Sequence, residues 1–210
     1  MPKRRENSTS PRPPRQRSAP SPITRARILT AARAHFFRHG FRNVTMDDLA
    51  AELGVSKKTL YAHFPSKDAL LAAVLQSKYE SIRRVLREVT SQRLPHFPDA
   101  LHALSRGVQN EMNELQPAFL RDMSKAPEIF QRVEQRRAKL IREHFGRLFR
   151  QGQRDGHVRT DIPVKLMIET LLGAVQAIMN PQKLEQLELA PRDVFVGLLD
   201  LLLHGAVVRK

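Results

Sequence analysis

Five residues within seven positions carry side chains of the kinds that bind nucleic acids. Lys57, Lys58, Thr59, Tyr61 and His63 all hold hydrogen-bond donors, and the two lysines add positive charge. Such donors contact DNA phosphates and the edges of bases in the major groove. A helix that holds all five outward would be a DNA-reading surface. Taken singly, each lysine has the alternative role of a solvated surface charge.

Two short helices, near 46–53 and 57–64, are expected to position these residues. Thr45 and Ser56 are good N-cap residues, and each follows a valine that can pair with a leucine one turn into the helix. Asp48 stands at the third helical position and completes a short capping box. Each cap typically contributes about 1 kcal/mol, so the start of each short helix is well defined.

Gly54 and Val55 separate the two helices. Glycine suits the left-handed residue that ends a helix, and Val55 can pack into the angle before the next one. This order of elements is typical of a helix-turn-helix. A supporting helix over 24–39, capped by Thr24, is expected before it. The residues expected to face inward are Ile28, Ala32, Phe36, Leu49, Ala50, Leu53, Val55, Leu60 and Phe64.

The start of the second short helix and a following lysine indicate an anionic partner. The first turn of a helix exposes N–H groups and the positive end of the dipole, which favours a phosphate near Ser56. Lys67 opens the next predicted helix, where a positive side chain is unfavourable to the dipole. A bound phosphate would explain Lys67, and plain solubility is the alternative.

The spacing of these residues resembles the N-terminal domain of TetR-family repressors over about residues 24–75, roughly a quarter of the chain. The resemblance implies that Thr45 and Lys67 hold phosphates, while Lys58 and Thr59 lie over base edges. The matching residues are Ile28, Leu29, Ala31, Ala32, Phe36, Gly40, Phe41, Val44, Thr45, Met46, Leu49, Ala50, Leu53, Gly54, Val55, Ser56, Thr59, Leu60, Tyr61, His63, Phe64, Ser66, Lys67, Asp68 and Leu70.

The candidate DNA-binding set therefore combines the residue pattern with the resemblance. The resemblance implies that Tyr61 and His63 contact the backbone or bases. It also implies a sequence-specific regulator, a repressor that leaves a near-palindromic operator when a small molecule binds. The set is Thr45, Ser56, Lys57, Lys58, Thr59, Tyr61, His63 and Lys67.

Positive charge is concentrated towards the N-terminus. The formal net charge is +15, and residues 1–65 hold 13 Lys and Arg against 4 Asp and Glu. Residues 1–22 contain six prolines and cannot bury apolar surface, so a disordered basic tail is expected. A polyanion such as double-stranded DNA is the expected partner. The alternative function is an architectural protein that coats DNA with little sequence preference.

The fold class expected is all-α, with about nine helices in a helix-turn-helix domain at 23–70 and a larger ligand-binding and dimerisation domain at 71–210. Glycine is scarce, and apolar residues recur at spacings of three and four. The helices expected in the larger domain are 67–90, 98–115, 117–123, 127–153, 163–179 and 191–207.

The last two long helices are apolar on more than one side. Such helices are buried on both sides, and a second copy of the chain is the simplest cover for one of them. The resemblance implies the same homodimer, joined through a four-helix bundle. The interface residues expected are Leu171, Val175, Ile178, Phe195, Leu198, Leu199 and Leu202.

A largely apolar ligand pocket is expected in the larger domain, because family members release DNA when a small molecule enters it. The candidate residues are Phe119, Met123, Phe130, Phe145, Phe149 and Met167. Core packing is the alternative role for all six. Helix 127–153 also carries seven basic residues, which form either a solvated face or a site that favours an anionic ligand.

Several function classes lack support in the sequence. The chain has no cysteine, which excludes disulfides and fits a reducing cytoplasm. Val194 to Val208, the longest apolar segment, is too short and too interrupted to cross a bilayer. His35 and His39 have the i, i+4 spacing of some metal sites but suit the end of a helix equally well. No cofactor or enzyme motif is present.

Overall fold

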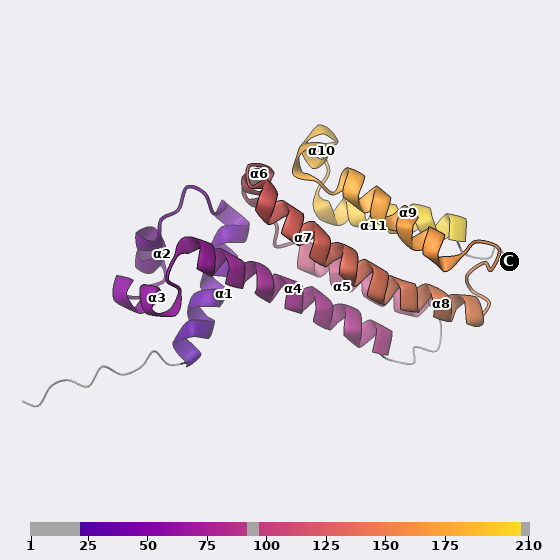
Figure 1. The fold of residues 1–210 in the computed structure, drawn as a ribbon, viewed down its shortest axis with the longest axis horizontal. Helices are drawn as coiled ribbons and strands as arrows, with labels where there is room; N and C mark the ends of the chain where they lie inside the picture. Colours follow the sequence, from indigo (N-terminus) through magenta and orange to yellow (C-terminus); the bar gives the residue numbers. More distant parts are fainter. Residues whose placement is uncertain (1–21, 92–96, 207–210) are drawn as a thin grey trace, which may run out of the picture.

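The computed structural model describes residues 22–91 and 97–206. Within these residues the chain is helical and has no β-strand, as the sequence predicts. Three helices lie at one end of an elongated molecule, and a long fourth helix runs from them along the body (Figure 1). These helices are α1 (Pro22–His39), α2 (Met46–Glu52), α3 (Lys57–His63) and α4 (Lys67–Ser91).

The body of the molecule is built from the remaining helices, of which α5, α7 and η1 pack against α4. The helical stretch from α7 to α8 is continuous and contains a π-helical turn, η1, between them. The last two long helices, α9 and α11, pack against each other at the far edge (Figure 1). The bounds are α5 (Phe97–Met112), α6 (Pro117–Ser124), α7 (Pro127–Leu140), η1 (Ile141–Phe145), α8 (Gly146–Arg154), α9 (Val164–Ile178), α10 (Pro181–Gln186) and α11 (Pro191–Ala206).

The first core lies among α1, α2 and α3, with α6 and the first turns of α4. Leu49, Leu60 and Phe36 are fully buried there, as predicted. Phe119 and Met123 of α6 complete this core, and Phe119 packs edge-on against Phe37 with ring centroids 4.9 Å apart. The helix-turn-helix is therefore held by a helix from the larger part of the chain.

The second core fills the body of the molecule between α5, the η1–α8 segment, α9 and α11. Its fully buried side chains include Phe145, Phe149, Leu171 and Leu199. His144 is a polar residue among these apolar side chains. It is fully buried, and its Nδ1 lies 3.0 Å from Oγ1 of Thr90.

Most predicted helices are present, with three differences. Helix α1 begins at Pro22, so Thr24 lies inside its first turn and is not the N-cap. Helix α10 was not predicted, although Asn180 caps it by accepting a hydrogen bond from the Lys183 N–H at 2.8 Å. The predicted helix 127–153 is interrupted by the π-helical turn η1. Apart from Pro22, the predicted tail lies outside the described residues.

Candidate DNA-binding surface

Thr45 starts α2 with a complete capping box. Its hydroxyl accepts the Asp48 N–H at 3.1 Å, and the Asp48 carboxylate accepts the Thr45 N–H at 2.9 Å. The hydrogen bond from the Thr45 hydroxyl, followed by the one from its N–H, lowers the pKa of Asp48. The charged carboxylate thus stabilises the first turn of α2, and exposed Thr45 stands beside those helix N–H groups.

The turn between α2 and α3 fixes the angle of the two helices. Gly54 has a φ of +61°, the left-handed conformation that glycine adopts without a steric cost. The Gly54 N–H donates to the Ala51 carbonyl at 3.2 Å, and the Val55 N–H donates to that of Ala50 at 3.0 Å. This pair of bonds is a Schellman motif, and it satisfies carbonyls that would otherwise end α2 unpaired.

Helix α3 is amphipathic in the manner predicted. Ser56 caps it, with its Oγ accepting the Thr59 N–H at 3.1 Å. Leu60 is fully buried, and Phe64 at the C-cap is buried beside it. Lys57, Lys58 and Tyr61 are exposed, and Tyr61 keeps 46% of its surface accessible to solvent.

The polar side chains on α3 are not equally available. Lys57 donates to the Asp47 carboxylate at 2.6 Å, and that hydrogen bond raises the pKa of Lys57. Lys58 has no carboxylate partner among the described residues. The Thr59 hydroxyl lies 2.8 Å from Oγ of Ser56, so it shares in the cap and still has hydrogen-bonding capacity left.

His63 and Lys67 lie closer to the protein than the sequence suggests. His63 is half-buried, and its Nε2 has no hydrogen-bond partner among the described residues. Lys67 donates to the carbonyls of Arg42 and Val44, each at 2.9 Å. Lys67 therefore braces the loop before α2, and one of its three N–H donors is left for a phosphate.

An aspartate of α6 holds the start of that same loop, and the sequence analysis missed it. The Asp122 carboxylate accepts the N–H groups of Phe41 at 2.6 Å and of Arg42 at 2.8 Å. Gly40 has a φ of +85°, and a Cβ added there would lie 2.4 Å from Oδ2 of Asp122. Only glycine fits, so α1, the loop and α6 form one locked unit. We call these contacts the α6 clamp.

A polar network also ties α1 to the body of the molecule. Arg33 of α1 donates to Glu114, in the turn after α5, at 2.9 Å, and buried Lys78 of α4 donates to Glu111 of α5 at 2.8 Å. Burial acts to raise the pKa of Glu111, but hydrogen bonds from Lys78 and Ser81, with the charges of Lys78 and Arg33, outweigh it and lower that pKa. The network is therefore charged at neutral pH.

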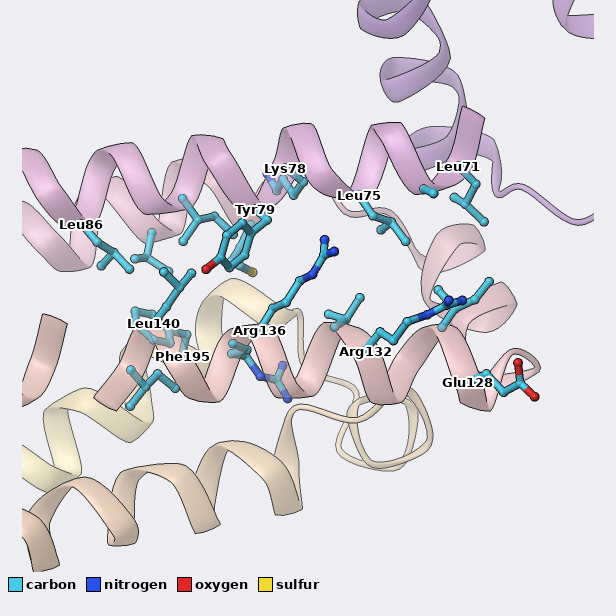
Figure 2. Close-up of a pocket in the computed structure, with 18 of the residues that line it drawn as sticks. Leu71, Leu75, Lys78, Tyr79, Leu86, Glu128, Arg132, Arg136, Leu140 and Phe195 are labelled. Carbon is cyan, nitrogen blue, oxygen red and sulfur yellow. The ribbon is translucent and has the colours of Figure 1, made fainter. Parts of the chain in front are cut away.

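A cavity of about 560 Å³ lies between α4 and α7, beside this network (Figure 2). Of the six residues predicted to form a pocket, Phe145 lines this cavity. Phe119 and Met123 pack in the first core with Phe130 against it, while Phe149 and Met167 pack in the second. Apolar periodicity identifies the buried side of a helix but does not distinguish a packed core from a cavity wall.

The predicted dimer residues divide in a similar way. Leu171, Val175, Phe195 and Leu199 are buried in the protomer's own core, so they have almost no surface left for a second copy. Ile178, Leu198 and Leu202 are half-buried. The exposed apolar side of the same two helices presents Leu166 and Leu201, which are 57% and 74% exposed.

Comparison with known proteins places the N-terminal helices in a family. Residues 28–74 match the family model of bacterial regulatory proteins of the tetR family. This part of the chain is similar to the N-terminal domain of TetR-family regulators. The match covers α2, α3 and most of α1, and it includes the start of α4. No helix within the described residues is long and apolar enough to span a membrane.

Two curated relatives extend this similarity. YvaF of Bacillus subtilis (strain 168) is 33% identical over 99 residues, which are 42% of this chain and 52% of YvaF. The alignment thus spans about half the length of that relative. UidR of Escherichia coli (strain K12) is 26% identical over 168 residues, 78% of this chain and 84% of UidR. Both are named as HTH-type transcriptional regulators.

A solved structure shares the TetR fold along most of the chain. SmeT, the repressor of the Stenotrophomonas maltophilia multidrug efflux pump SmeDEF, superposes with a TM-score of 0.64 at 21% identity. The match covers 89% of this chain and 92% of SmeT. SmeT in complex with triclosan has the same TM-score. At this identity the similarity shows the fold.

Proposed function

We propose that this chain is a DNA-binding transcriptional regulator that works as a homodimer and reads a near-palindromic operator with α3. The observation that carries the proposal is the outer face of α3. Lys57, Lys58 and Tyr61 stand exposed on a helix that two caps and buried Leu60 hold in place. A rigid, basic, donor-rich helix of this kind fits the major groove.

The N-termini of α2 and α3 supply the phosphate contacts in this proposal. Thr45 and Ser56 are exposed beside the first-turn N–H groups of their helices, and such groups favour phosphates. Lys67, with one donor left, stands at the start of α4. These contacts set the position on DNA, whereas Lys58 and Thr59 read bases.

The dimer in this proposal forms through the exposed side of α9 and α11. A groove there is lined by apolar and small residues of both helices, among them Leu166, Ala174, Leu198, Leu201 and Leu202. Exposed leucines of this number on neighbouring helices favour a protein partner. A two-fold dimer presents two copies of α3 to half-sites about one helical turn, or a multiple of it, apart.

Release by a small molecule is the last part of the proposal, and the cavity beside α4 and α7 supports it. Its volume of about 560 Å³ suits a ligand of drug size. Helix α7 follows directly after α6, which holds the loop before α2 through Asp122. A ligand that displaces α7 would thereby move α6 and change the spacing of the two reading helices.

Selection from a random DNA pool tests the function directly. The full chain should enrich a near-palindromic sequence and hold it against bulk competitor DNA with a specificity ratio of about 10³ or more. Enrichment of no sequence, with binding that bulk DNA competes away equally well, would identify an architectural DNA-coating protein instead.

A further inference from the structure

The cavity between α4 and α7 has one apolar end and one polar side. Its apolar end is closed by Leu86 of α4, Leu140 of α7, Phe145 of η1 and Phe195 of α11. Figure 2 shows Arg136 extending from α7 toward α4, with Tyr79 beside it, while Arg132 runs along α7 toward the end that holds Glu128. A ligand that fills the cavity would contact apolar groups and guanidinium groups together.

The basic residues in the cavity wall differ in whether a carboxylate already neutralises them. Lys78 is paired with Glu111 and Glu114, and Arg137 is paired with Glu134. Arg132 and Arg136 have no carboxylate partner among the described residues. Two positive charges on successive turns of α7 therefore face the cavity uncompensated.

Two carboxylates also line the cavity, at the end nearest the DNA-binding helices. Asp68 lies in the first turn of α4 and Glu128 in the first turn of α7. The helix dipole stabilises a negative side chain at these positions without any ligand. In Figure 2, Glu128 lies at the opposite end of the cavity from Leu86 and Phe195, with Arg136 between them.

Arg136 is the better placed of the two free cations. Its guanidinium carbon lies 5.5 Å from the centre of the Tyr79 ring, a cation–π contact that holds the side chain across the cavity. The planar guanidinium can donate two parallel hydrogen bonds to one carboxylate. Its position next to the apolar end suits an anion that carries a long apolar body.

We propose that the cavity binds an amphipathic carboxylate, with its head group on Arg136 and its apolar body directed toward Leu86, Phe145 and Phe195. Arg132, one turn earlier on α7, adds attraction for the same head group. This inference rests on the proposed function only in taking the α4–α7 cavity as the effector site. It names the chemical class of the effector. From the sequence alone, the basic residues of helix 127–153 form either a solvated face or a site for an anionic ligand.

Calorimetric titration of the full chain, without DNA, tests the proposal with three ten-carbon probes below their micellar concentrations. Decanoate should bind once per protomer and about tenfold or more tightly than 1-decanol, because a hydrogen bond to a charged group is stronger than one to a neutral group. Decyltrimethylammonium should bind more weakly than either. Arg136→Gln should remove most of the preference for decanoate over decanol and leave decanol affinity unchanged.

Lys139→Gln is the matched control, because it removes one positive charge from the same helix. Lys139 is exposed and does not line the cavity. It should retain the preference for decanoate. The proposal is overturned if decanol or the ammonium probe binds as tightly as decanoate, if no probe binds, or if Arg136→Gln and Lys139→Gln behave alike. Site-specific DNA binding alongside any of these results would leave the regulator function standing.

The direction of the bound probe gives a second, independent readout. The chain has no tryptophan, so Phe195→Trp introduces a single tryptophan at the apolar end. Bromine quenches tryptophan at short range, so 10-bromodecanoate should quench the fluorescence strongly and 2-bromodecanoate weakly. Equal quenching, or the reverse order, would contradict the proposed orientation. Unaltered binding of decanoate to the variant confirms that the new side chain leaves the cavity intact.

Discussion

At the scale of single residues, two adjacent lysines on α3 are expected to differ in function. Lys57 is held by Asp47 at 2.6 Å, whereas Lys58 has no carboxylate partner among the described residues. Lys58→Ala should therefore change base preference by about 1–3 kcal/mol at the positions it reads. Lys57→Ala should have a smaller effect, because part of its charge is already neutralised. Binding measured on single-base variants of the selected site checks both.

Thr59 offers a matched comparison on the same helix. Thr59→Val keeps the shape of the side chain and removes the hydroxyl that lies beside Ser56. A change in base preference without loss of helix content, measured by circular dichroism, would assign the hydroxyl to base reading. If Lys58→Ala and Thr59→Val both bind every site as the parent chain does, the reading face lies elsewhere.

A second residue-scale prediction concerns His144 in the core. Burial is the main cause that lowers the pKa of His144 below its ordinary value of 6.5, so the folded chain holds it neutral. Below pH 6.5 the unfolded chain takes up a proton there that the folded chain does not, and the free energy of unfolding falls as pH falls. Urea unfolding at pH 8 and pH 5.5 should show a smaller loss for His144→Gln than for the parent.

The residue scale also shows what sequence alone could provide. Caps at Thr45 and Ser56 and the i, i+4 pair Leu60 and Phe64 are local patterns, so they predicted which side of α3 faces outward. The role of Lys67 depends on two backbone carbonyls more than 20 positions earlier. No local pattern carries that information, and the same holds for Asp122.

At the scale of elements, the α6 clamp predicts that two glycines with similar backbones respond differently to substitution. Gly40→Ala should cost about 1–2 kcal/mol for its left-handed backbone and more for the contact with Asp122. Gly54→Ala is the control, because its φ is also positive and an added Cβ meets no atom within 4 Å. Thermal or urea unfolding of both variants measures the difference.

A double-mutant cycle isolates the clamp itself. Removing the carboxylate with Asp122→Ala leaves two N–H groups without their acceptor and should cost about 2 kcal/mol or more. In that background Gly40→Ala should cost less than in the parent chain, because the group it meets is gone. Strict additivity of the two substitutions would show that α6 does not hold the loop through Asp122.

Prediction of whole elements succeeded where apolar periodicity ran long or where caps marked a short helix, and it missed a short helix and a local change of helix type. Helix α10 has six residues, too few for a periodic signal, and the Asn180–Pro181 pair that starts it was the available sign. The turn η1 interrupts the predicted helix 127–153 without any proline or glycine inside it. Such a π-helical turn depends on packing around the helix, so the sequence gives no local cue for it.

At the scale of the whole molecule, a dimer interface on α9 and α11 stays a prediction, but several residues named for it are covered within the protomer. Leu171, Val175, Phe195 and Leu199 were predicted to contact the second copy, and all four lie in the protomer's own core. A helix that is apolar nearly all round gives no sign of which side the protomer covers. Only the packing of α9 against α11 and α8, and of α11 against α5, decides it.

The exposed side of α9 and α11 leads to the prediction that couples assembly to function. Leu201→Glu should shift the chain from dimer to monomer in sedimentation, because a two-fold interface would bury two carboxylates where it now buries leucines at about 1.5–3 kcal/mol each. Helix content should stay unchanged, since Leu201 is 74% exposed in the protomer. Affinity for the two-half-site operator should fall steeply, because each monomer keeps only one reading helix.

Leu187→Glu is the control, because it alters another exposed leucine that lies away from the groove. It should leave both the dimer and the operator affinity intact. A Leu201→Glu chain that stays dimeric on DNA would place the interface on a different surface.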